Sequence, residues 1–429
     1  ALRPAFDTVA DMIGKGKKVP ESLLEIFAQN PEYSAKLDSL INAKDKVPFK
    51  IFDKKNAEKL FGKNLNISAS QLEKFNLCRF SYFCNYGLNV RERQRAEINP
   101  MQYGTIVHYI LERFFGEYTK EEYLSLEEDK FQKIVCAYLA EYAVKYFGEE
   151  QLESNSFTYR LKTILDNVMY LMKHIMEELS QSEFFVADCE LKIGEDIPSY
   201  TIVLPDGHKI AVCGSVDRVD IMQRADITYL RIIDYKTGTK QFKLSDILYG
   251  INLQMLLYLH SIEASGSDKY GEIVPAGILY MPATVPYISS DSLKSIDKLP
   301  DELNKKLKMN GLLLKDTEII HGMDKTDAAT YIPVKIKAGE PVSSTSLATL
   351  AEFGKIFKKV DMLIAEMGKN IYNGNIEAKP LKGGHDSCEY CPYDSVCAYR
   401  QSNPITCFSV DNKTVIEEIT NEINGKEEE

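Results

Sequence analysis

The stretch KIAVCGSVDRVDIMQRADITYLRIIDYKTG, residues 209–238, decides the fold of this chain. It is rich in β-branched residues and carries turn residues between apolar runs, which is typical of neighbouring sheet strands. With the residues just before it, four strands are predicted: 186–193, 200–204, 209–221 and 228–236. Asp206-Gly207 supplies the hairpin turn between the second strand and the third.

Helical sequence surrounds these strands. Ser68-Ala-Ser-Gln71 has the capping-box arrangement of a helix start. Apolar residues then recur at helical spacing from Gly104 to about Phe115, and in two longer stretches up to Phe185. Downstream we expect a helix, a short apolar strand and a further helix: 251–262, 276–280 and 345–372. Strands followed by helix and strand predict an α/β fold with a sheet flanked by helices.

The composition is that of a folded globular chain. Of 429 residues, 44% are hydrophobic and 27% are charged, which excludes a disordered, collagen-like or coiled-coil chain. The net charge is −11, so any nucleic-acid site must be a local basic surface. No apolar run approaches the roughly 18 residues of a membrane span, and the opening sequence is not a signal peptide. We therefore expect a cytoplasmic protein whose nine cysteines are metal ligands or core thiols.

Two carboxylates and a lysine end the predicted strand pair. Asp217 lies on the first strand, while Asp234 and Lys236 share one face of the second. Carboxylates brought together from neighbouring strands bind Mg²⁺, and the lysine would orient water or offset charge on a phosphate. The alternative is a solvated surface turn, which an isolated Asp-x-Lys usually is. The apolar Ile232-Ile233 before Asp234 favours a buried strand end instead.

Two helical pairs at i,i+4 spacing are candidates of lower specificity. His108 and Glu112 lie at the edge of an apolar helix face, where a histidine is more often a packing residue than a ligand. Gln254 and Tyr258 have the same spacing, and helix–sheet packing with a polar tip explains them equally well. Spacing alone does not assign either pair to a site.

The cysteines near the end of the chain give a more specific signal. Cys388-x-x-Cys391-x₅-Cys397 has the spacing of a metal site, and three thiolates need a fourth ligand. The candidates for the fourth ligand are Cys78, Cys84, Cys407 and His385. Zinc and an iron–sulfur cluster both fit this pattern. Cys136, Cys189 and Cys213 lie in apolar segments and are expected to be core residues.

Taken in order, these motifs resemble the RecB-like branch of the PD-(D/E)XK nucleases. The resembling elements are Gly104-x₃-His108-x₃-Glu112, Gly214-x-x-Asp217-Arg-x-Asp220, Asp234-Tyr-Lys236-Thr-Gly and Gln254-x₃-Tyr258. The segment Ser68-x-Ser-Gln-Leu-Glu-Lys-Phe with Cys78-x-Phe-x-Tyr-Phe, and the triple cysteine, look like the B subunits of AddAB-type helicase/deoxyribonucleases. The resemblance covers about residues 57–400. It departs from the family at Cys78-Arg79-Phe80, where Cys-Pro-Phe is common.

The resemblance implies a restriction-endonuclease-like mixed sheet and a Mg²⁺-dependent deoxyribonuclease, an exonuclease acting on single-stranded DNA at double-strand breaks. The implied catalytic residues are Asp217, Asp234, Lys236, Gln254 and Tyr258. The implied ligands of Mg²⁺ are His108, Asp217 and Asp234. Glu190 is a weaker addition. A [4Fe–4S] cluster is implied on Cys78, Cys388, Cys391 and Cys397, which selects Cys78 as fourth ligand.

The implied partners are DNA and the A subunit of the heterodimer. The chain lacks a Gly-x₄-Gly-Lys-[Ser/Thr] loop, so it should not bind ATP, and it looks like a C-terminal fragment. We expect a helical segment over 1–64, the nuclease domain over 65–407 and a frayed acidic tail over 408–429. Two other functions remain open: a catalytically silent DNA-binding or scaffold module held by the cluster, and a zinc-ribbon interaction protein.

Overall fold

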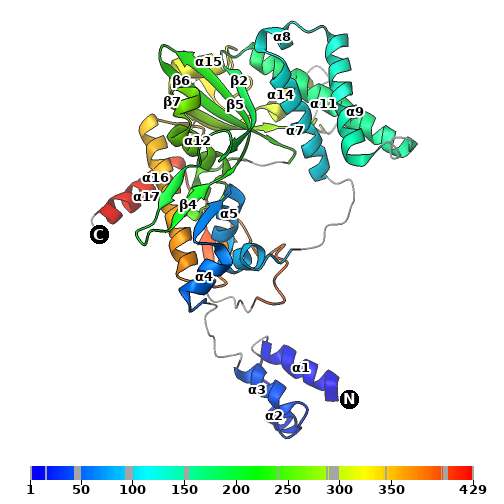
Figure 1. Ribbon diagram of the computed structural model, residues 1–429, viewed down its shortest axis with the longest axis vertical. Helices are drawn as coiled ribbons and strands as arrows, with labels where there is room; N and C mark the ends of the chain where they lie inside the picture. Colours follow the sequence, from blue (N-terminus) through cyan, green and yellow to red (C-terminus); the bar gives the residue numbers. More distant parts are fainter. Residues whose placement is uncertain are drawn as a thin grey trace. The chain divides into compact units, whose positions relative to one another are not determined.

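The computed structural model describes most of the chain. The described residues are 2–14, 17–42, 50–91, 100–148, 154–238, 241–286, 288, 299–343, 345–397, 399 and 404–427. The chain divides into two compact units, Ala1–Lys50 and Ile51–Glu429, which are coloured along the sequence in Figure 1. This division falls earlier in the chain than the boundary at residue 64 that the sequence predicts.

The first unit is a small helical bundle. Its described helices are α1 (Leu2–Gly14), α2 (Glu21–Ala28) and α3 (Ser34–Asn42). The rings of Phe6, Phe27 and Tyr33 contact one another with centroids 4.8 to 5.6 Å apart, and Val9 and Leu37 are buried beside them. The unit therefore has a hydrophobic core of its own.

A mixed six-stranded sheet forms the centre of the second unit. Its strands, in spatial order, are β11 (Leu347–Ala348), β8 (Asn310–Leu314), β7 (Glu272–Pro282), β6 (Ile227–Lys236), β5 (Gly214–Arg224) and β2 (Phe185–Ile193). β5 is antiparallel to both β2 and β6, whereas β6 and β7 are parallel and are joined by the crossover helix α12 (Gln254–Ser265). The predicted α/β class is confirmed.

The predicted strand 209–221 is two strands in two sheets. β4 (Lys209–Val212) pairs with β1 (Asn64–Ile67) and β3 (Thr201–Val203), and β5 begins at Gly214 in the main sheet. A Cβ atom at Gly214 would lie 2.2 Å from the hydroxyl oxygen of Tyr258, so only glycine allows this close approach of α12. The chain changes sheets at this residue, which periodicity alone does not reveal.

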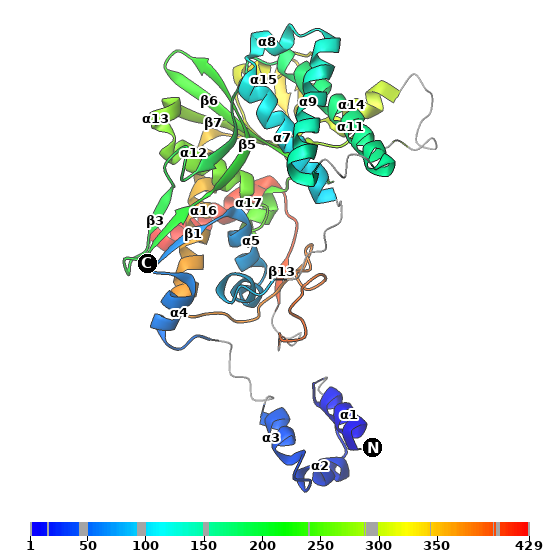
Figure 2. The ribbon, with the colours of Figure 1, turned by 45° about the vertical axis from the view of Figure 1, so that its right-hand side comes forward.

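Helices cover both faces of the main sheet, as Figures 1 and 2 show. α7 (Pro100–Glu117) packs on β2 and β6, and α11 (Asn155–Ser180) and α9 (Glu128–Phe147) pack on α7. On the other side, α12 packs on β6 and β7 and against α16 (Leu350–Tyr372). The faces that these helices share with the sheet make up one continuous core.

The segment after Phe408, expected to be a frayed tail, forms helix α17 (Asn412–Glu427). Val415 and Ile419 are fully buried in the core of the second unit, and Lys359 of α16 forms an ion pair of 2.5 Å with Glu422. Buried apolar residues at helical spacing therefore hold this segment, although its overall composition is polar.

Shorter elements complete the described part of the chain: α4 (Lys54–Phe61), α5 (Ala69–Leu77), α6 (Arg79–Tyr82), the π-turn η1 (Phe83–Gly87), α8 (Lys120–Leu124), the 3₁₀ turn η2 (Leu244–Tyr249), α13 (Ser267–Tyr270), α14 (Leu299–Leu307), α15 (Thr317–Met323), β9 (Lys335–Lys337), β10 (Glu340–Val342), β12 (Leu381–Gly383) and β13 (Ile405–Cys407). The predicted capping box of α5 is present, with Ser68 and Gln71 bonded to each other's backbone. Among the described helices, none combines the length and apolarity needed to cross a membrane.

Candidate active site

Asp217 and Asp234 come together at the end of the β5–β6 ladder. Arg218 of β5 pairs with Ile233 of β6 in an antiparallel ladder. Asp217, just before Arg218, and Asp234, just after Ile233, therefore adjoin this pair on the same side. The backbone N–H of Tyr235 donates a hydrogen bond of 2.9 Å to Oδ2 of Asp217. Asp234 is 2% exposed, so both carboxylates lie at a nearly closed strand end, as the apolar Ile232-Ile233 pair predicts.

Three ligand-type side chains from three elements converge at this strand end. Ligand atoms of His108 (α7), Glu190 (β2) and Asp217 (β5) all lie within 4.8 Å of one another. Nδ1 of His108 is 2.9 Å from Oε1 of Glu190, and its Nε2 is 3.6 Å from Oδ2 of Asp217. One nitrogen and several carboxylate oxygens at this spacing suit a hard divalent cation.

Glu190 is the residue whose importance the sequence understates. Its backbone has φ +50°, a conformation that is rare for a non-glycine residue. Ser215 of β5 donates a hydrogen bond of 2.8 Å to Oε2 of Glu190 and fixes the second oxygen of the carboxylate. Backbone strain of this kind clusters at functional sites. Strand alternation alone would not have singled out this position.

The charges at this site are mutually dependent. Burial, together with the nearby charge of Asp234, raises the pKa of Asp217 to about 7. Although burial opposes it, hydrogen bonds from His108 and Ser215 hold the pKa of Glu190 below its ordinary value. Burial also opposes the charged form of His108, but Glu190 and Asp217 still raise its pKa. A buried cluster with more carboxylates than cations is stabilised by an added divalent cation.

Lys236 lies beside the carboxylates. Its Nζ is 2.6 Å from Oδ2 of Asp234 and 5.8 Å from the ring centroid of Tyr280. The side chain of Lys236 is 26% exposed, so its ammonium group reaches both the buried carboxylate and solvent. This position agrees with the predicted shared face of Asp234 and Lys236.

Gln254 and Tyr258 lie in the first two turns of α12. Tyr258 is buried, and the backbone N–H of Ala69 lies near its hydroxyl, where it partly offsets the effect of burial on the pKa. Burial raises the pKa of Tyr258 to about 12, with smaller contributions from the charges of Asp217 and Asp234. Tyr258 therefore lies near the acidic cluster, and Gln254 is half-buried at the start of the same helix.

A buried ion network supports the site from the opposite face of the strands. Arg218 donates two hydrogen bonds of 2.7 Å to Asp220 and a third to Glu178 of α11. Arg231 also bonds Asp220 and Glu178, and all four side chains are at most 1% exposed. Arg218 also donates to the hydroxyl of Tyr235, whose ring contacts His108 edge-on. Of this network, only Arg218 and Asp220 belong to a motif recognised in the sequence.

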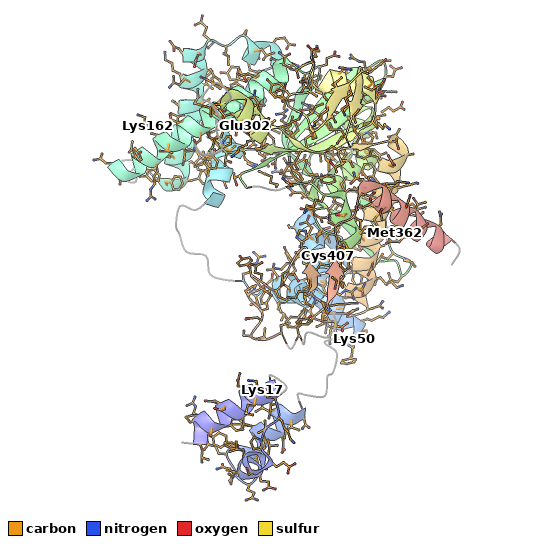
Figure 3. The ribbon with its side chains drawn as sticks, turned by 180° about the vertical axis from the view of Figure 1, so that it is seen from behind. Lys17, Lys50, Lys162, Glu302, Met362 and Cys407 are labelled. Carbon is orange, nitrogen blue, oxygen red and sulfur yellow. The ribbon has the colours of Figure 1, made fainter. Side chains whose placement is uncertain are left out.

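The cysteines gather at a second centre. Cys78 and Cys84 are buried in one apolar cluster with Cys391 and Cys397. Burial raises the pKa of the Cys397 thiol, and the nearby thiol of Cys388 adds to this effect. Of the other alternative fourth ligands, Cys407, labelled in Figure 3, packs with Ile251 and Leu381, and Nε2 of His385 is 3.6 Å from Oδ1 of Asp246. Cys84, in contrast, shares the cluster with Cys78 and stays an alternative ligand.

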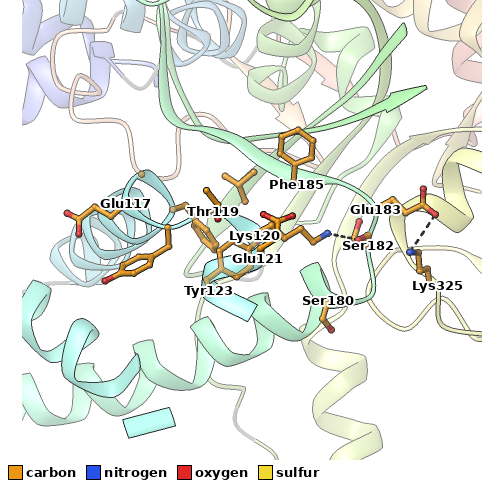
Figure 4. A pocket seen from close by; sticks show the side chains of 14 residues that line it. Glu117, Thr119, Lys120, Glu121, Tyr123, Ser180, Ser182, Glu183, Phe185 and Lys325 are labelled. Carbon is orange, nitrogen blue, oxygen red and sulfur yellow. Dashed lines mark hydrogen bonds and ion pairs between the residues drawn. The ribbon is translucent and has the colours of Figure 1, made fainter. Parts of the chain in front are cut away.

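One cavity in the described part of the chain is lined by residues outside both centres. Figure 4 shows this cavity of about 810 Å³ between the end of α7, α8 and the start of β2. Lys120 reaches across it to the carbonyl of Ser182, and Lys325 pairs with Glu183. None of its lining residues belongs to the acidic cluster or to the cysteine cluster. This cavity therefore belongs to neither centre.

Strand-end acids with a lysine beside them on a mixed sheet are an arrangement that suits divalent-metal-dependent hydrolysis. Residues 66–398 match the model of the PD-(D/E)XK nuclease superfamily, and the chain belongs to that superfamily. The predicted family is confirmed.

Curated relatives are more specific. The chain is similar to proteins named as the B subunit of an ATP-dependent helicase/deoxyribonuclease. The protein from Thermoanaerobacter sp. is 34% identical over 354 residues, covering 80% of this chain and 30% of that protein. Those from Ruminiclostridium cellulolyticum and Clostridium kluyveri are 32% and 35% identical, covering 94% and 89% of this chain and 37% and 34% of theirs. The chain thus spans about a third of these relatives.

Proposed function

We propose that this chain is a divalent-metal-dependent nuclease that hydrolyses phosphodiester bonds of DNA. The observation that carries the proposal is the meeting of His108, Glu190 and Asp217, with Asp234 beside them, at one strand end. The superfamily match and the names of the relatives support the same chemistry. A scaffold module without catalysis gives no reason to keep so many carboxylates in a nearly closed site.

His108, Glu190, Asp217 and Asp234 would hold the cation, which we propose to be Mg²⁺. A bound Mg²⁺ supplies Lewis-acid activation of the scissile phosphate and stabilises the leaving oxygen. Lys236, next to Asp234, is placed to orient the attacking water and to offset negative charge on the phosphate. Gln254 and Tyr258 would line the site or contact DNA. Lys236 would thus act on the attacking water, and the carboxylates would balance the charge of the cation.

The finer assignments follow the resemblance and the relatives. We propose exonuclease action on single-stranded DNA, in the cytoplasm, as the nuclease part of a helicase–nuclease with an A subunit as partner. Because the net charge of the chain is −11, DNA must meet a local basic surface, and its affinity should fall steeply with salt.

We also propose a [4Fe–4S] cluster on Cys78, Cys388, Cys391 and Cys397. The support is the common cluster of Cys78, Cys391 and Cys397 and the position of Cys388 near Cys397. A cluster with these ligands would join the end of α5 to the C-terminal part of the chain. It would close a long loop, which restricts the unfolded state most strongly. We expect a structural centre and not a redox-catalytic one.

One experiment tests the nuclease proposal directly. The purified chain is incubated with single-stranded DNA with and without Mg²⁺, beside the variants Asp217→Ala and Lys236→Ala. Asp226→Ala is the matched control, because Asp226 is an exposed acid at the other end of the same hairpin. Cleavage only with Mg²⁺, lost in the two site variants and kept in the control, supports the proposal. Near wild-type cleavage by Asp217→Ala contradicts it.

Iron and sulfide analysis of the same sample tests the cluster. Any of the four cysteines changed to Ser should lose iron, and Cys136→Ser should keep it. Full iron in Cys78→Ser would assign the fourth position to Cys84, Cys407 or His385. A colourless sample with stoichiometric zinc would replace the iron–sulfur proposal by a zinc site.

A further inference from the structure

The start of α12 is capped by a different helix. Leu253, the N-cap residue of α12, has no side-chain oxygen that could bond the free N–H groups of the first turn. Instead, the backbone N–H of Leu253 donates a hydrogen bond of 2.7 Å to Oε1 of Glu73 in α5. A carboxylate at a helix N-terminus also interacts favourably with the helix dipole. Glu73 therefore accepts the N–H of the N-cap residue, one of the free N–H groups at the start of α12, from 180 positions away in the sequence.

Two further contacts attach α5 to the same region. Nδ2 of Asn76 donates a hydrogen bond of 3.1 Å to the carbonyl of Gly250, just before α12. Gly250 has φ +70°, and a Cβ atom there would lie 2.3 Å from Nδ2 of Asn76, so the approach needs glycine. At the other end of α5, the backbone N–H of Ala69 lies near the hydroxyl of Tyr258. Three residues of α5 thus fix both the loop before α12 and the second turn of that helix.

Both cysteine-bearing segments contact the loop that leads into α12. α5 ends directly at Cys78. From the other segment, Leu381 and Cys407 pack with Ile251, and Nε2 of His385 is 3.6 Å from Oδ1 of Asp246. This places residues 244–253 between the two parts of the chain that carry the cysteines.

We propose that Glu73 is a positioning residue for the active site, and that α5 transmits the closure of the cysteine cluster to the start of α12. Glu73 acts by holding the N–H of Leu253, directly before the first turn of α12, and so fixes the helix whose Tyr258 lies near the acidic cluster. The part that concerns cleavage rests on the proposed nuclease function. The part that concerns the cap of α12 does not.

A charge effect is the competing explanation for Glu73. Burial raises the pKa of Tyr280, and the nearby charges of Asp234, Glu73 and Asp246 raise it further. Glu73 is therefore also part of the acidic surroundings of the site. The variant Glu73→Gln separates the two explanations. Its amide oxygen can still accept the N–H of Leu253, but its charge is gone.

The experiment compares Glu73→Ala, Glu73→Gln and the control Lys74→Ala, which truncates the neighbouring residue on the same helix. For each chain, we measure kcat and KM for Mg²⁺-dependent cleavage of single-stranded DNA, iron content, and hydrogen exchange of the amides 253–258 without DNA. Glu73→Ala should lower kcat by about tenfold to a hundredfold with normal iron content, because small misplacement of site residues is costly. Its α12 amides should exchange faster, while Glu73→Gln and Lys74→Ala behave like the wild type.

Several outcomes overturn the proposal. Unchanged exchange at 253–258 in Glu73→Ala excludes the capping role, whether or not the chain cleaves DNA. A Glu73→Gln variant as slow as Glu73→Ala assigns the effect to charge. If the wild type does not cleave DNA, the nuclease function fails and the exchange data still decide the capping role.

The coupling to the cysteines is tested with Cys78→Ser, or, if that variant does not fold, with wild-type protein from which a chelator has removed the iron. Faster exchange at 253–258 after iron loss is expected. Exchange at these amides that does not respond to iron loss contradicts the coupling.

Discussion

At the scale of single residues, the site holds a carboxylate whose ionised form is poorly accommodated without a cation. Asp217 is the clearest case, because burial and Asp234 both disfavour its charge. Glu190 is held in a strained backbone conformation and its carboxylate is fixed by His108 and Ser215. Such a site is costly to the metal-free fold, which is the usual relation between activity and stability at functional residues.

Asp217→Asn should abolish cleavage and stabilise the metal-free protein. The folded-state pKa of Asp217, about 7, lies above its value in the unfolded chain. Folding therefore takes up a proton, and the wild type loses stability as the pH rises from about 4 to about 7. The uncharged amide avoids this loss, so the variant should gain on the order of 1–3 kcal/mol above pH 7 and nothing near pH 4. Thermal unfolding in the presence of a chelator at pH 5 and pH 8 measures this gain in stability. A variant less stable than the wild type at pH 8 contradicts the explanation.

Glu190→Gln should weaken metal binding. It removes a carboxylate charge that lies within 4.8 Å of the ligand atoms of His108 and Asp217. We expect the affinity for Mg²⁺ or Mn²⁺ to fall by about tenfold or more, measured by titration calorimetry. Glu195→Gln is the matched control, since Glu195 is an exposed acid in the turn after the same strand. Equal affinities in the two variants would exclude Glu190 from the metal site.

At the scale of elements, polar clamps fix how the helices lie around the sheet. The Arg218–Asp220–Arg231–Glu178 network joins α11 to β5 and β6 behind the site. A second clamp lies between α12 and α16, where Nε2 of His260 donates to Asp361. Buried ion pairs add little net stability but are costly to break, so such clamps specify one arrangement of the elements.

The His260 clamp should make stability depend on pH. Burial opposes the charge, yet hydrogen bonds with Asp361 and Glu263 raise the pKa of His260 to about 9. A raised histidine pKa stabilises the fold fully below about pH 6.5, and this contribution is lost as the pH rises through about 9. Its ring also stacks on Phe357 with centroids 4.7 Å apart.

His260→Gln should therefore lower the free energy of unfolding by about 2–3 kcal/mol at pH 6 and by clearly less at pH 10. Urea unfolding at the two pH values gives the comparison. The exposed His321 offers a control, His321→Gln, which makes the same exchange away from this clamp. A constant difference between wild type and His260→Gln across this range would assign the effect of His260 to ring packing alone.

At the scale of the whole molecule, the chain has two compact units with separate cores. The second unit holds the acidic cluster, the cysteines and helix α17, so every proposed site lies within it. The first unit has aromatic packing of its own, and none of its described residues belongs to the acidic cluster or the cysteine cluster.

A chain that begins at Lys50 should keep the nuclease unit intact. The start at Lys50 preserves the hydrogen bond from the N–H of Ile51 to the carbonyl of Gly374. We expect the same iron content, the same Mg²⁺-dependent cleavage and a melting temperature within about 2 °C, because no core residue of the second unit is removed. Calorimetry and cleavage assays of both chains measure this. A large fall in melting temperature would show that the two units stabilise each other.

The sequence by itself determined the family, the change from helical to strand periodicity, and the acids Asp217 and Asp234 with Lys236 at a strand end. These features are local, because strand alternation and short spacings depend only on neighbouring residues. The cysteine triplet is local in the same way. The sequence also predicted the cap at Ser68, since a capping box lies within four consecutive residues.

Only the tertiary structure decided the long-range partners. Glu190 meets His108 across 82 positions, Glu73 caps α12 across 180, and Cys84 lies with Cys78 and the late cysteines in one cluster. It also divided the predicted strand 209–221 between two sheets at Gly214 and turned the polar tail into α17. The physical reason is that these features depend on which elements pack together, and the same side chains at the same local spacing would fit a packed core or a solvated surface equally well.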